Sequence, residues 1–376
     1  MKRFLSVLLM LVLAASIGAA AIADAPPGIS AESCIMIEAG SGTLIYQKNA
    51  QRRMSMASTT KIMTGLLLAE HGELDTTIEV TDEMVRVEGS AMGLRPGDMV
   101  DYRSLLNGLM LVSGNDAANT IALSLAGSIE KFASMMNARA AELGMTGTHF
   151  VTPSGLDHDD HYTTAYDMAL LGRAALQNTE LAQIVRSTAG VCNFGNPPKQ
   201  YTFSNHNRLL RNYKGAIGIK TGFTKKSGRC LVSAAEKDGK TVVIVTLNAS
   251  DDWNDHKKLF DFGFSMLEVV QPDNSLPLSR LPVAGSDDTI EICAGIIDLC
   301  VLKGTSSRIT RRVILPDFLL APVELHQTIG YIEYFLNEKP IGRAEILAGN
   351  AADYTPAPQK PQSPVWQNFI YILGIK

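Results

Sequence analysis

The sequence has few of the residues that most often build metal centres or disulfide frameworks. Its 376 residues include only five cysteines, an odd number, and none of them forms a C-x-x-C pair. This pattern argues against a disulfide scaffold and against a thiolate metal site. No block of basic residues stands out, and the formal net charge is −4, so nucleic acid is not expected as a partner.

The individual cysteines and histidines support the same conclusion. Cys34 and Cys230 lie in apolar strand-like runs and are expected to be small buried hydrophobic residues, whereas pairing of Cys293 with Cys300 stays open. The one histidine cluster is H-D-D-H at residues 158–161, just before an expected helix that begins near residue 163 or 164. Aspartate and threonine are natural caps at such a position, so we expect no metal and no cofactor.

The first 23 residues are predicted to be a secretory signal peptide. Lys2 and Arg3 precede an apolar run over residues 4–23, which ends in small residues with the A-x-A pattern. An uncleaved membrane anchor is the less favoured alternative. We therefore expect an exported protein.

Three short clusters carry the chemistry. They are S-T-T-K at residues 58–61, S-G-N at residues 113–115 and K-T-G at residues 220–222. Together they supply a serine nucleophile, an amine one helical turn away that can act as its base, a second hydroxyl with an amide, and a cationic strand edge. This is the minimum set for acyl transfer through an acyl-serine without histidine or metal.

The S-x-x-K and K-[ST]-G patterns are not convincing without their context, because each of them occurs a second time in this chain. Ser128 and Lys131 form another S-x-x-K, but Ser128 follows a glycine and opens the expected helix 129–143, so it is interpreted as an N-cap. Lys226-Ser227-Gly228 is another K-S-G, but it lies in a polar turn between two strand-like runs.

The three clusters lie on, or next to, predicted helices and strands. Ser58 is expected to begin a helix with an apolar face, and Ser104 to cap a helix over 105–112 that breaks at Ser113 before a second helix over 116–126. A hairpin is expected over 33–47. A strand over 216–222 is expected to precede a second hairpin formed by 229–235 and 241–247.

The composition changes near residue 272, beyond which the chain is rich in strand patterns. The expected organisation is a signal peptide at 1–23, a catalytic domain at 24–272, a small β domain at 273–350, a proline-rich linker at 351–364 and a C-terminal segment at 365–376. That last segment carries apolar residues at helical spacing. We expect a short interfacial membrane anchor, with a tail docked on the protein as the alternative.

With its clusters placed, the chain resembles the low-molecular-mass penicillin-binding proteins, the serine D-alanyl-D-alanine carboxypeptidases. The resemblance covers most of the mature chain: M-A-S-T-T-K-I-M-T at 56–64, G-L-R-P-G-D at 93–98, S-G-N-D-A-A at 113–118, H-Y-T-T-A-Y-D-M-A at 161–169 and I-K-T-G-F-T at 219–224. Ile217 departs from it, because the family usually has aspartate there, which puts local substrate positioning in doubt.

The resemblance implies an α/β (α+β) fold, with helices around an antiparallel sheet, followed by an all-β domain. The implied substrate is the peptidoglycan stem peptide ending in D-Ala-D-Ala, with β-lactams as inhibitors. The implied location is the outer face of the bacterial cytoplasmic membrane, at the cell wall.

The residues then take roles in that reaction. Ser58 is expected to be acylated and Lys61 to act as its base, provided that burial and nearby cations lower the pKa of the amine. Ser113 is expected to relay a proton and Asn115 to bind the substrate peptide. The carboxylate clamp is Lys220 and Thr221, Gly222 admits the ligand, and the oxyanion hole is formed by the backbone amides of Ser58 and Phe223.

The sequence disfavours two alternative functions. A serine β-lactamase of the commonest class needs a glutamate in an E-x-x-L-N loop between the second and third clusters, and the only such pattern, at 333–337, lies beyond Lys220. A catalytically silent wall-binding or sensor protein that only acylates with penicillin is disfavoured by the intact Ser58 and Lys61. A turnover assay separates that alternative from an enzyme.

Overall fold

The structure, a computed structural model, describes residues 25–355 and divides them into two compact units. The first contains the described chain to Glu268 together with Cys300–Lys303, and the second contains Val269–Leu299 and the chain from Gly304 onward. The predicted signal peptide, the C-terminal segment at 365–376 and most of the linker at 351–364 lie outside the described residues. Within residues 25–355, no helix combines the length and apolar character needed to cross a bilayer.

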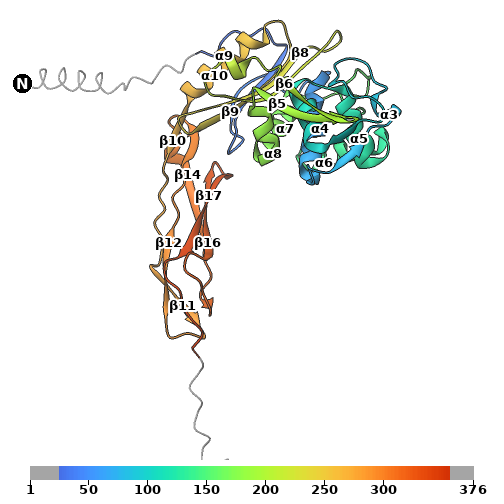
Figure 1. The fold of residues 1–376 in the computed structure, drawn as a ribbon. Helices are drawn as coiled ribbons and strands as arrows, with labels where there is room; N and C mark the ends of the chain where they lie inside the picture. The colour runs from blue at the N-terminus through green and yellow to red at the C-terminus, as the bar shows by residue number, and fades with distance from the viewer. Residues whose placement is uncertain (1–24, 356–376) are drawn as a thin grey trace, which may run out of the picture. The chain divides into compact units, whose positions relative to one another are not determined.

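The first unit is built on a five-stranded antiparallel sheet in the order β2-β1-β9-β8-β7 (Figure 1). The predicted hairpin at 33–47 and the predicted hairpin around Asp238-Gly239 are both present. The strands are β1 (Ser33–Glu38), β2 (Leu44–Lys48), β7 (Ala216–Thr224), β8 (Gly228–Lys237) and β9 (Lys240–Ala249).

The central strands are buried on both faces, because alternate side chains enter two different cores. On β1, Ile35 packs into the core shared with most of the helices, whereas Met36 packs into a smaller core against α10. Adjacent helices cover the two sides of the sheet in Figure 1. The helices are η1 (Ala57–Thr60), α2 (Lys61–His71), α3 (Asp82–Val85), α4 (Tyr102–Leu111), α5 (Asn115–Ala126), α6 (Ile129–Glu142), α7 (Ala165–Gln177), α8 (Thr179–Arg186), α9 (Leu209–Asn212) and α10 (Asp252–Met266).

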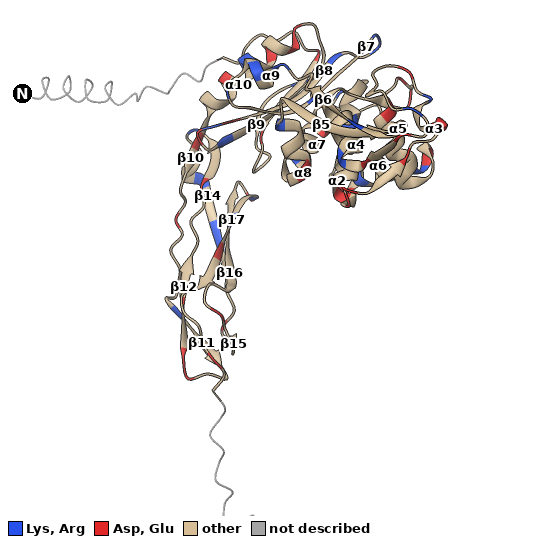
Figure 2. Ribbon diagram, viewed as in Figure 1, with Lys and Arg blue, Asp and Glu red and all other residues tan. Residues whose placement is uncertain are grey.

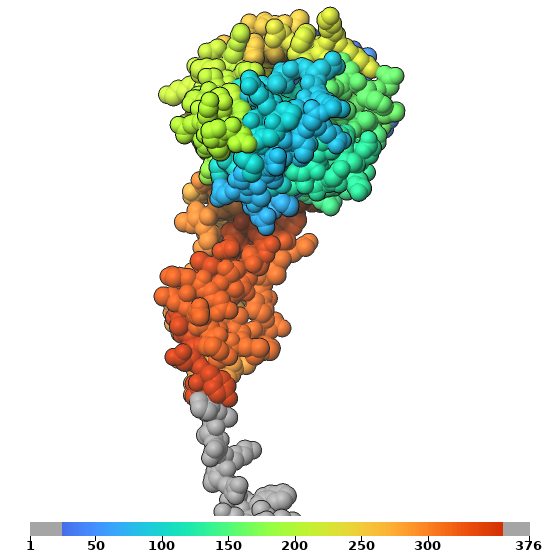
Figure 3. Space-filling model, turned by 45° about the vertical axis from the view of Figure 1, so that its right-hand side comes forward, coloured from blue at the N-terminus to red at the C-terminus, as the bar shows by residue number. Residues whose placement is uncertain are grey.

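A second, four-stranded sheet lies in the same unit, in the order β3-β4-β5-β6. Its long hairpin leads directly into the segment beside the active site, at residues 204–208. In Figure 3 the residues of the first half of the chain, blue to green, form one face of this unit, with yellow-green residues at its edge. The strands are β3 (Thr77–Glu79), β4 (Met99–Asp101), β5 (Ala189–Gly195) and β6 (Pro198–Ser204).

Local predictions about helix ends had mixed outcomes. Ser128 caps α6, as expected, with its hydroxyl accepting from the Lys131 amide. The prediction that Ser104 caps a helix is wrong: Asp101 is the cap of α4 and accepts from the Ser104 amide. The Ser104 hydroxyl instead accepts from the Asn193 amide, because a hydroxyl inside the first turn is free to bond to a neighbouring strand. The helix expected at Ser58 begins as a 3-10 turn, and the α-helix starts at Lys61.

The second unit is all-β, as predicted. A six-stranded sheet runs in the order β14-β16-β17-β12-β11-β15 around its own apolar core. Glu333, of the E-x-x-L-N pattern, lies on β16 in this unit. The strands are β11 (Arg280–Ala284), β12 (Thr289–Ala294), β14 (Ile309–Ile314), β15 (Leu319–Leu320), β16 (Thr328–Leu336) and β17 (Lys339–Ala348), with η2 (Ser306–Arg308); β10 (Leu267–Val270) and β13 (Leu299–Leu302) lie where the two units divide.

The cysteines are free thiols. Cys34 and Cys230 are fully buried, as predicted, and Cys293 and Cys300 are not paired with each other. Figure 2 shows acidic and basic residues interspersed along the described chain, with no large area of one sign in the view.

Candidate active site

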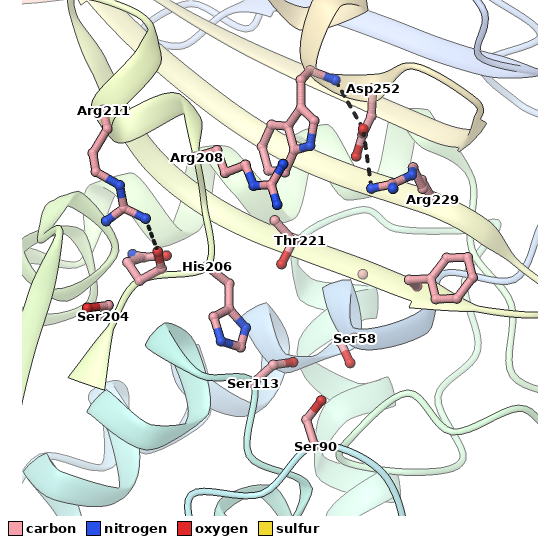
Figure 4. A pocket seen from close by; sticks show the side chains of 14 residues that line it. Ser58, Ser90, Ser113, Ser204, His206, Arg208, Arg211, Thr221, Arg229 and Asp252 are labelled. Atoms are coloured by element: carbon pink, nitrogen blue, oxygen red, sulfur yellow. Dashed lines mark hydrogen bonds and ion pairs between the residues drawn. The ribbon is translucent and has the colours of Figure 1, made fainter. Parts of the chain in front are cut away.

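A cavity of about 570 Å³ opens beside Ser58 in the first unit. In Figure 4, the hydroxyls of Ser58, Ser90 and Ser113 point toward one another, and Thr221 lies across the pocket on β7. The three clusters, separated by more than 160 positions in the sequence, therefore meet at one cavity. The remaining lining residues are Ser204, Asn205, His206, Arg208, Arg211, Gly222, Phe223, Arg229, Asp252 and Trp253.

Ser58 lies in the 3-10 turn η1, and Lys61, three residues on, begins α2. The Nζ atom of Lys61 is 3.0 Å from Ser58 Oγ. Lys61 also donates to Asn115 Oδ1 at 2.6 Å and to the Ser154 carbonyl at 2.7 Å. A neutral amine has two N–H donors and one lone pair. With two acceptors already facing it, the neutral amine would direct its lone pair at Ser58 Oγ.

The surroundings of Lys61 favour that neutral form. Its side chain is completely buried. Burial lowers the pKa of the amine well below its usual value, and the nearby Lys220 ammonium lowers it further, while the Asp116 carboxylate acts in the opposite direction. The sequence-based requirement that burial and a neighbouring cation lower this pKa is met.

The S-G-N cluster joins α4 to α5. Ser113 has a φ of 63°, which is uncommon for a non-glycine residue, and Ala57, just before the nucleophile, has a φ of 47°. Backbone held in this way is concentrated at functional sites, where the surrounding structure fixes it. The hydroxyl of Ser113 lines the cavity.

Both polar groups of the Asn115 side chain are engaged inside the protein. The oxygen accepts from Lys61, and the nitrogen donates to the Glu88 carbonyl at 2.6 Å. The backbone amide of Asn115 also donates to the Ser90 carbonyl at 2.7 Å. Asn115 therefore holds the amine of Lys61 and ties the loop at residues 88–90 to the site.

Asp116 extends this tie. Its buried carboxylate accepts from the backbone amides of Met92, Gly93 and Leu94 at 2.8 to 3.1 Å. The G-L-R-P-G-D block of the sequence begins at this loop. Asn115 and Asp116 thus fix the loop at residues 88–94, and Ser90 of this loop lines the cavity.

The K-T-G cluster lies on β7 at the edge of the five-stranded sheet. A Cβ atom built on Gly222 would lie 3.1 Å from the Ser58 amide nitrogen and 3.0 Å from that of Thr59. Glycine is thus what lets β7 approach the nucleophile turn so closely. The Phe223 side chain is 65% exposed, which agrees with a role for its backbone rather than its ring.

Lys220 is not among the residues that line the cavity. It is 1% exposed, and its Nζ donates to the Thr221 carbonyl at 3.0 Å. Burial lowers the pKa of this lysine to about 7. Its ammonium is close enough to lower the pKa of Lys61, whereas Thr221 and Gly222 are the members of this cluster that border the cavity.

Sequence reasoning missed a loop that holds the nucleophile turn. The Ser154 carbonyl accepts from Lys61, and the Pro153 carbonyl accepts from Thr64 Oγ1 at 2.6 Å. Gly155 packs so tightly that a Cβ atom there would lie 1.9 Å from the Ala57 carbonyl oxygen. Only the P-S-G turn residues at 153–155 signal this loop in the sequence, and a turn has many other uses.

The histidine cluster has a structural part in the same region. His161 is buried, its Nε2 lies 2.8 Å from Thr60 Oγ1, and its Nδ1 accepts from the Val151 amide at 2.9 Å. Burial lowers its pKa to about 4, so a neutral ring links the loop to the nucleophile helix. Thr164 caps α7, as the sequence predicted for this position.

Comparison with known proteins agrees with this geometry. Residues 20–251 match the peptidase S11 family, described as D-alanyl-D-alanine carboxypeptidase, and residues 267–354 match the penicillin-binding protein 5 C-terminal domain. The carboxypeptidase DacF of Bacillus subtilis is 30% identical, over 92% of this chain and 95% of its own length. DacC of Escherichia coli is 31% identical, over 85% of this chain and 84% of its own.

Solved structures extend the similarity to three dimensions. Penicillin-binding protein 5 of Haemophilus influenzae aligns with a TM-score of 0.65 at 26% identity, over 88% of this chain and 99% of its own. A D-alanyl-D-alanine carboxypeptidase of Mycobacterium tuberculosis aligns with a TM-score of 0.62 at 33% identity, over 65% of this chain and 95% of its own. The chain therefore belongs to the D-alanyl-D-alanine carboxypeptidases, the low-molecular-mass penicillin-binding proteins that act through an acyl-serine.

Proposed function

We propose that Ser58 is the residue acylated when this carboxypeptidase removes the terminal D-alanine from peptidoglycan stem pentapeptides. The observation that carries the assignment is the 3.0 Å contact between Ser58 Oγ and a buried lysine amine whose other acceptors are already in place. A serine hydroxyl needs such a base, because it is a poor nucleophile at neutral pH.

The reaction then follows the positions of the groups. Neutral Lys61 takes the proton of the Ser58 hydroxyl as Oγ attacks the carbonyl carbon between the two D-alanines. The backbone amides of Ser58 and Phe223 stabilise the resulting oxyanion. Ser113 passes a proton to the leaving amine, the C–N bond breaks, and D-alanine departs. Water then hydrolyses the acyl-serine by the same route in reverse order.

Asn115 and Lys220 support this chemistry through their effects on Lys61. Asn115 fixes the direction of the Lys61 amine, and the Lys220 ammonium lowers the pKa of that amine. Thr221 borders the cavity and contributes its hydroxyl to the substrate's C-terminal end. Gly222 keeps the strand close to the Ser58 amide.

The proposed setting is the outer face of the bacterial cytoplasmic membrane. The apolar leader at residues 1–23 supports export, and the apolar residues at helical spacing in residues 365–376 support a peripheral membrane contact. Peptidoglycan, the substrate of the family, is assembled on that side of the membrane.

The direct test is D-alanine release from a D-Ala-D-Ala-terminated pentapeptide by purified mature protein. We expect steady release by the wild type, and loss of both release and penicillin adduct in Ser58→Ala. Ser128→Ala is the matched control, because Ser128 also stands three residues before a lysine yet only caps α6. A penicillin adduct mapped to any serine other than Ser58 would refute the assignment, and adduct formation without peptide turnover would favour the sensor alternative.

A further inference from the structure

A second cavity, of about 470 Å³, opens in the first unit and shares no lining residue with the catalytic cavity. One of its walls is the G-L-R-P-G-D block, which the reaction above does not use: Gly93, Arg95 and Asp98 line the cavity. The other wall is the hairpin of β5 and β6, through residues of the segment 194–201. The volume lies in the range of small-molecule sites.

Both walls of this second cavity continue into the catalytic cavity. Ser90 lines the catalytic cavity, and the chain reaches the second cavity two residues later, at Met92. Ser204, at the end of β6, lines the catalytic cavity (Figure 4), and Tyr201, three residues earlier on the same strand, lines the second one. A long ligand that leaves the catalytic cavity between these two walls therefore enters the second cavity.

Hydrogen bonds hold the two walls in place. The Asp98 carboxylate accepts from the backbone amide of Arg95 at 2.8 Å, which fixes the turn of the G-L-R-P-G-D block. Met99, the next residue along the chain, pairs with Gly195 of β5, so the block is joined to the hairpin. Binding in this cavity therefore needs little ordering of the backbone, which favours affinity.

The cavity combines an aromatic ring with free polar groups. The Tyr201 ring stacks on buried Phe194 with 4.3 Å between the ring centroids, and Tyr201 is 39% exposed. The face of an aromatic ring is electron-rich and attracts the weakly positive C–H groups of a sugar ring. Within residues 25–355, the side chains of Arg95 and Lys199 have no hydrogen bond or ion pair, so their donors are free for a ligand.

The polar groups suit a neutral sugar better than an anion. Arg95 and Lys199 can donate to hydroxyl and acetamido oxygens, and the Asn196 amide can both donate and accept. The Asp98 carboxylate can accept from sugar hydroxyls, whereas it would repel an anionic ligand in the same cavity.

We propose that the second cavity binds an N-acetylated amino sugar of the glycan strand that carries the substrate's stem peptide. The proposal rests on the carboxypeptidase function above and assigns a second part of the same substrate. Four amino acids separate the sugar from the scissile bond, and they span about 13 Å when extended. Three residues of β6, from Ser204 to Tyr201, cover about 10 Å. The tether is therefore long enough for the sugar to reach the Tyr201 ring while the peptide occupies the catalytic cavity.

The test compares D-alanine release from the free pentapeptide and from the same pentapeptide linked to a disaccharide of N-acetylglucosamine and N-acetylmuramic acid. We expect the wild type to favour the disaccharide-linked substrate. Tyr201→Ala should lose about 10-fold in kcat/KM for that substrate alone, because the stacking surface is removed. The loss should appear in KM, since the sugar lies away from the reacting atoms.

Two control substitutions test whether the aromatic ring itself is responsible. Tyr201→Phe keeps the ring and should retain the preference for the disaccharide-linked substrate. Tyr166→Ala removes a tyrosine that is 38% exposed on α7 and does not line the second cavity, and it should behave like the wild type.

The charged side chains are tested in the same way. Arg95→Gln and Lys199→Gln should each lose about 2- to 10-fold in kcat/KM for the disaccharide-linked substrate, because a hydrogen bond to the sugar is removed. Lys214→Gln, an exposed change of equal charge outside both cavities, should not. Equal losses on the free pentapeptide would overturn the proposal, because the cavity would then bind the stem peptide.

A measurement without turnover separates this proposal from the assignment of Ser58. The probe is N,N′-diacetylchitobiose, an uncharged disaccharide of N-acetylglucosamine, observed by saturation-transfer NMR. Transfer should be present with the wild type and with Ser58→Ala, and lost with Tyr201→Ala. No transfer with the wild type, or an unchanged substrate preference in the Tyr201→Ala, Arg95→Gln and Lys199→Gln variants, would overturn this proposal alone. Failure of the wild type to release D-alanine from the free pentapeptide would instead overturn the proposed function.

Discussion

The charge of a single amine controls the reactivity of Ser58. Lys61 can accept a proton only when it is neutral, and both burial and the Lys220 ammonium lower its pKa. Acylation by penicillin should therefore slow as the pH falls below that pKa. Removing the amine in Lys61→Ala should slow acylation by about 10²–10⁴-fold, the usual contribution of a general base.

The part played by Lys220 can be measured separately. Lys220→Gln removes a cation that destabilises protonated Lys61, so the pKa of Lys61 should rise and the acidic limb of the acylation profile should move to higher pH. Stopped-flow acylation rates between pH 5 and 9 would show the shift, with Lys258→Gln, an exposed change of equal charge, as the control. An acidic limb at the wild-type pH in Lys220→Gln would contradict electrostatic coupling of the two lysines.

At the scale of elements, the nucleophile turn depends on the close approach of the loop at residues 153–155. Gly155 has a φ of +84°, and a Cβ atom there would meet the backbone oxygen of Ala57 at 1.9 Å. Because backbone cannot move aside cheaply, Gly155→Ala should displace the turn that carries Ser58. We expect a loss of about 2 kcal/mol or more in the free energy of unfolding and a collapse of penicillin labelling.

Gly127→Ala provides the matched control for this prediction. Gly127 has a φ of +75°, but a Cβ atom there would meet nothing within 4 Å. In this variant the left-handed backbone conformation should lower the free energy of unfolding by about 1 kcal/mol, but no collision occurs. Ser58 should therefore be labelled by penicillin as in the wild type. Urea unfolding together with penicillin labelling would measure both, and equal effects of the two substitutions would show that the close approach is unimportant.

His256 links three elements of the first unit. Its Nδ1 contacts the Ser233 hydroxyl on β8, and its Nε2 contacts the Thr246 hydroxyl on β9, while the residue itself belongs to α10. The ring is fully buried, and burial lowers its pKa to about 3. The ordinary pKa of histidine is about 6.5. Between about pH 6.5 and pH 3, His256 therefore takes up a proton in the unfolded chain but not in the folded chain.

The stability supplied by neutral His256 is therefore complete above about pH 6.5 and is lost as the pH falls toward about 3. We expect this residue to contribute up to about 1.4 kcal/mol per pH unit to the decline in unfolding free energy. His256→Gln should flatten that decline, and exposed His326→Gln should not. The fluorescence of Trp253 on α10 reports the first unit, and it becomes the only tryptophan once residues 365–376 are removed. An unchanged slope in His256→Gln would contradict this account.

At the scale of the whole molecule, the catalytic groups and the proposed membrane segment occupy separate parts of the chain. The residues that line the cavity lie between Ser58 and Trp253, whereas the apolar C-terminal segment begins at residue 365. A short interfacial segment buries few residues, so its binding should be weak and reversible. Deleting residues 365–376 should therefore release the protein from liposomes and leave peptide hydrolysis intact.

Co-sedimentation and D-alanine release, measured on the same preparations, check both halves of this prediction. Full-length mature protein that fails to sediment with liposomes would rule out the anchor. Loss of hydrolysis on deletion would show instead that the segment docks on the protein.

The sequence alone determined the groups of the reaction and most of their supports. Ser58 and Lys61 are three residues apart, and this spacing brings their side chains together on any helical turn. Apolar runs bounded by turn residues indicated the strands, and the glycine before Ser128 indicated that this serine is a cap. Local spacing was enough in each case, because neighbours along the chain remain neighbours after folding.

Only the tertiary structure decided which contacts hold these groups and how far their pKa values are shifted. The carbonyls of Ser154 and Glu88 have no side-chain signature, since every residue carries one, so no pattern could show that they hold Lys61 and Asn115. The burial of Lys220 and the contact of its amine with the Thr221 carbonyl depend on the packing around β7. Burial and the approach of charges across long sequence separations set the pKa of an amine, and both exist only once the chain has folded.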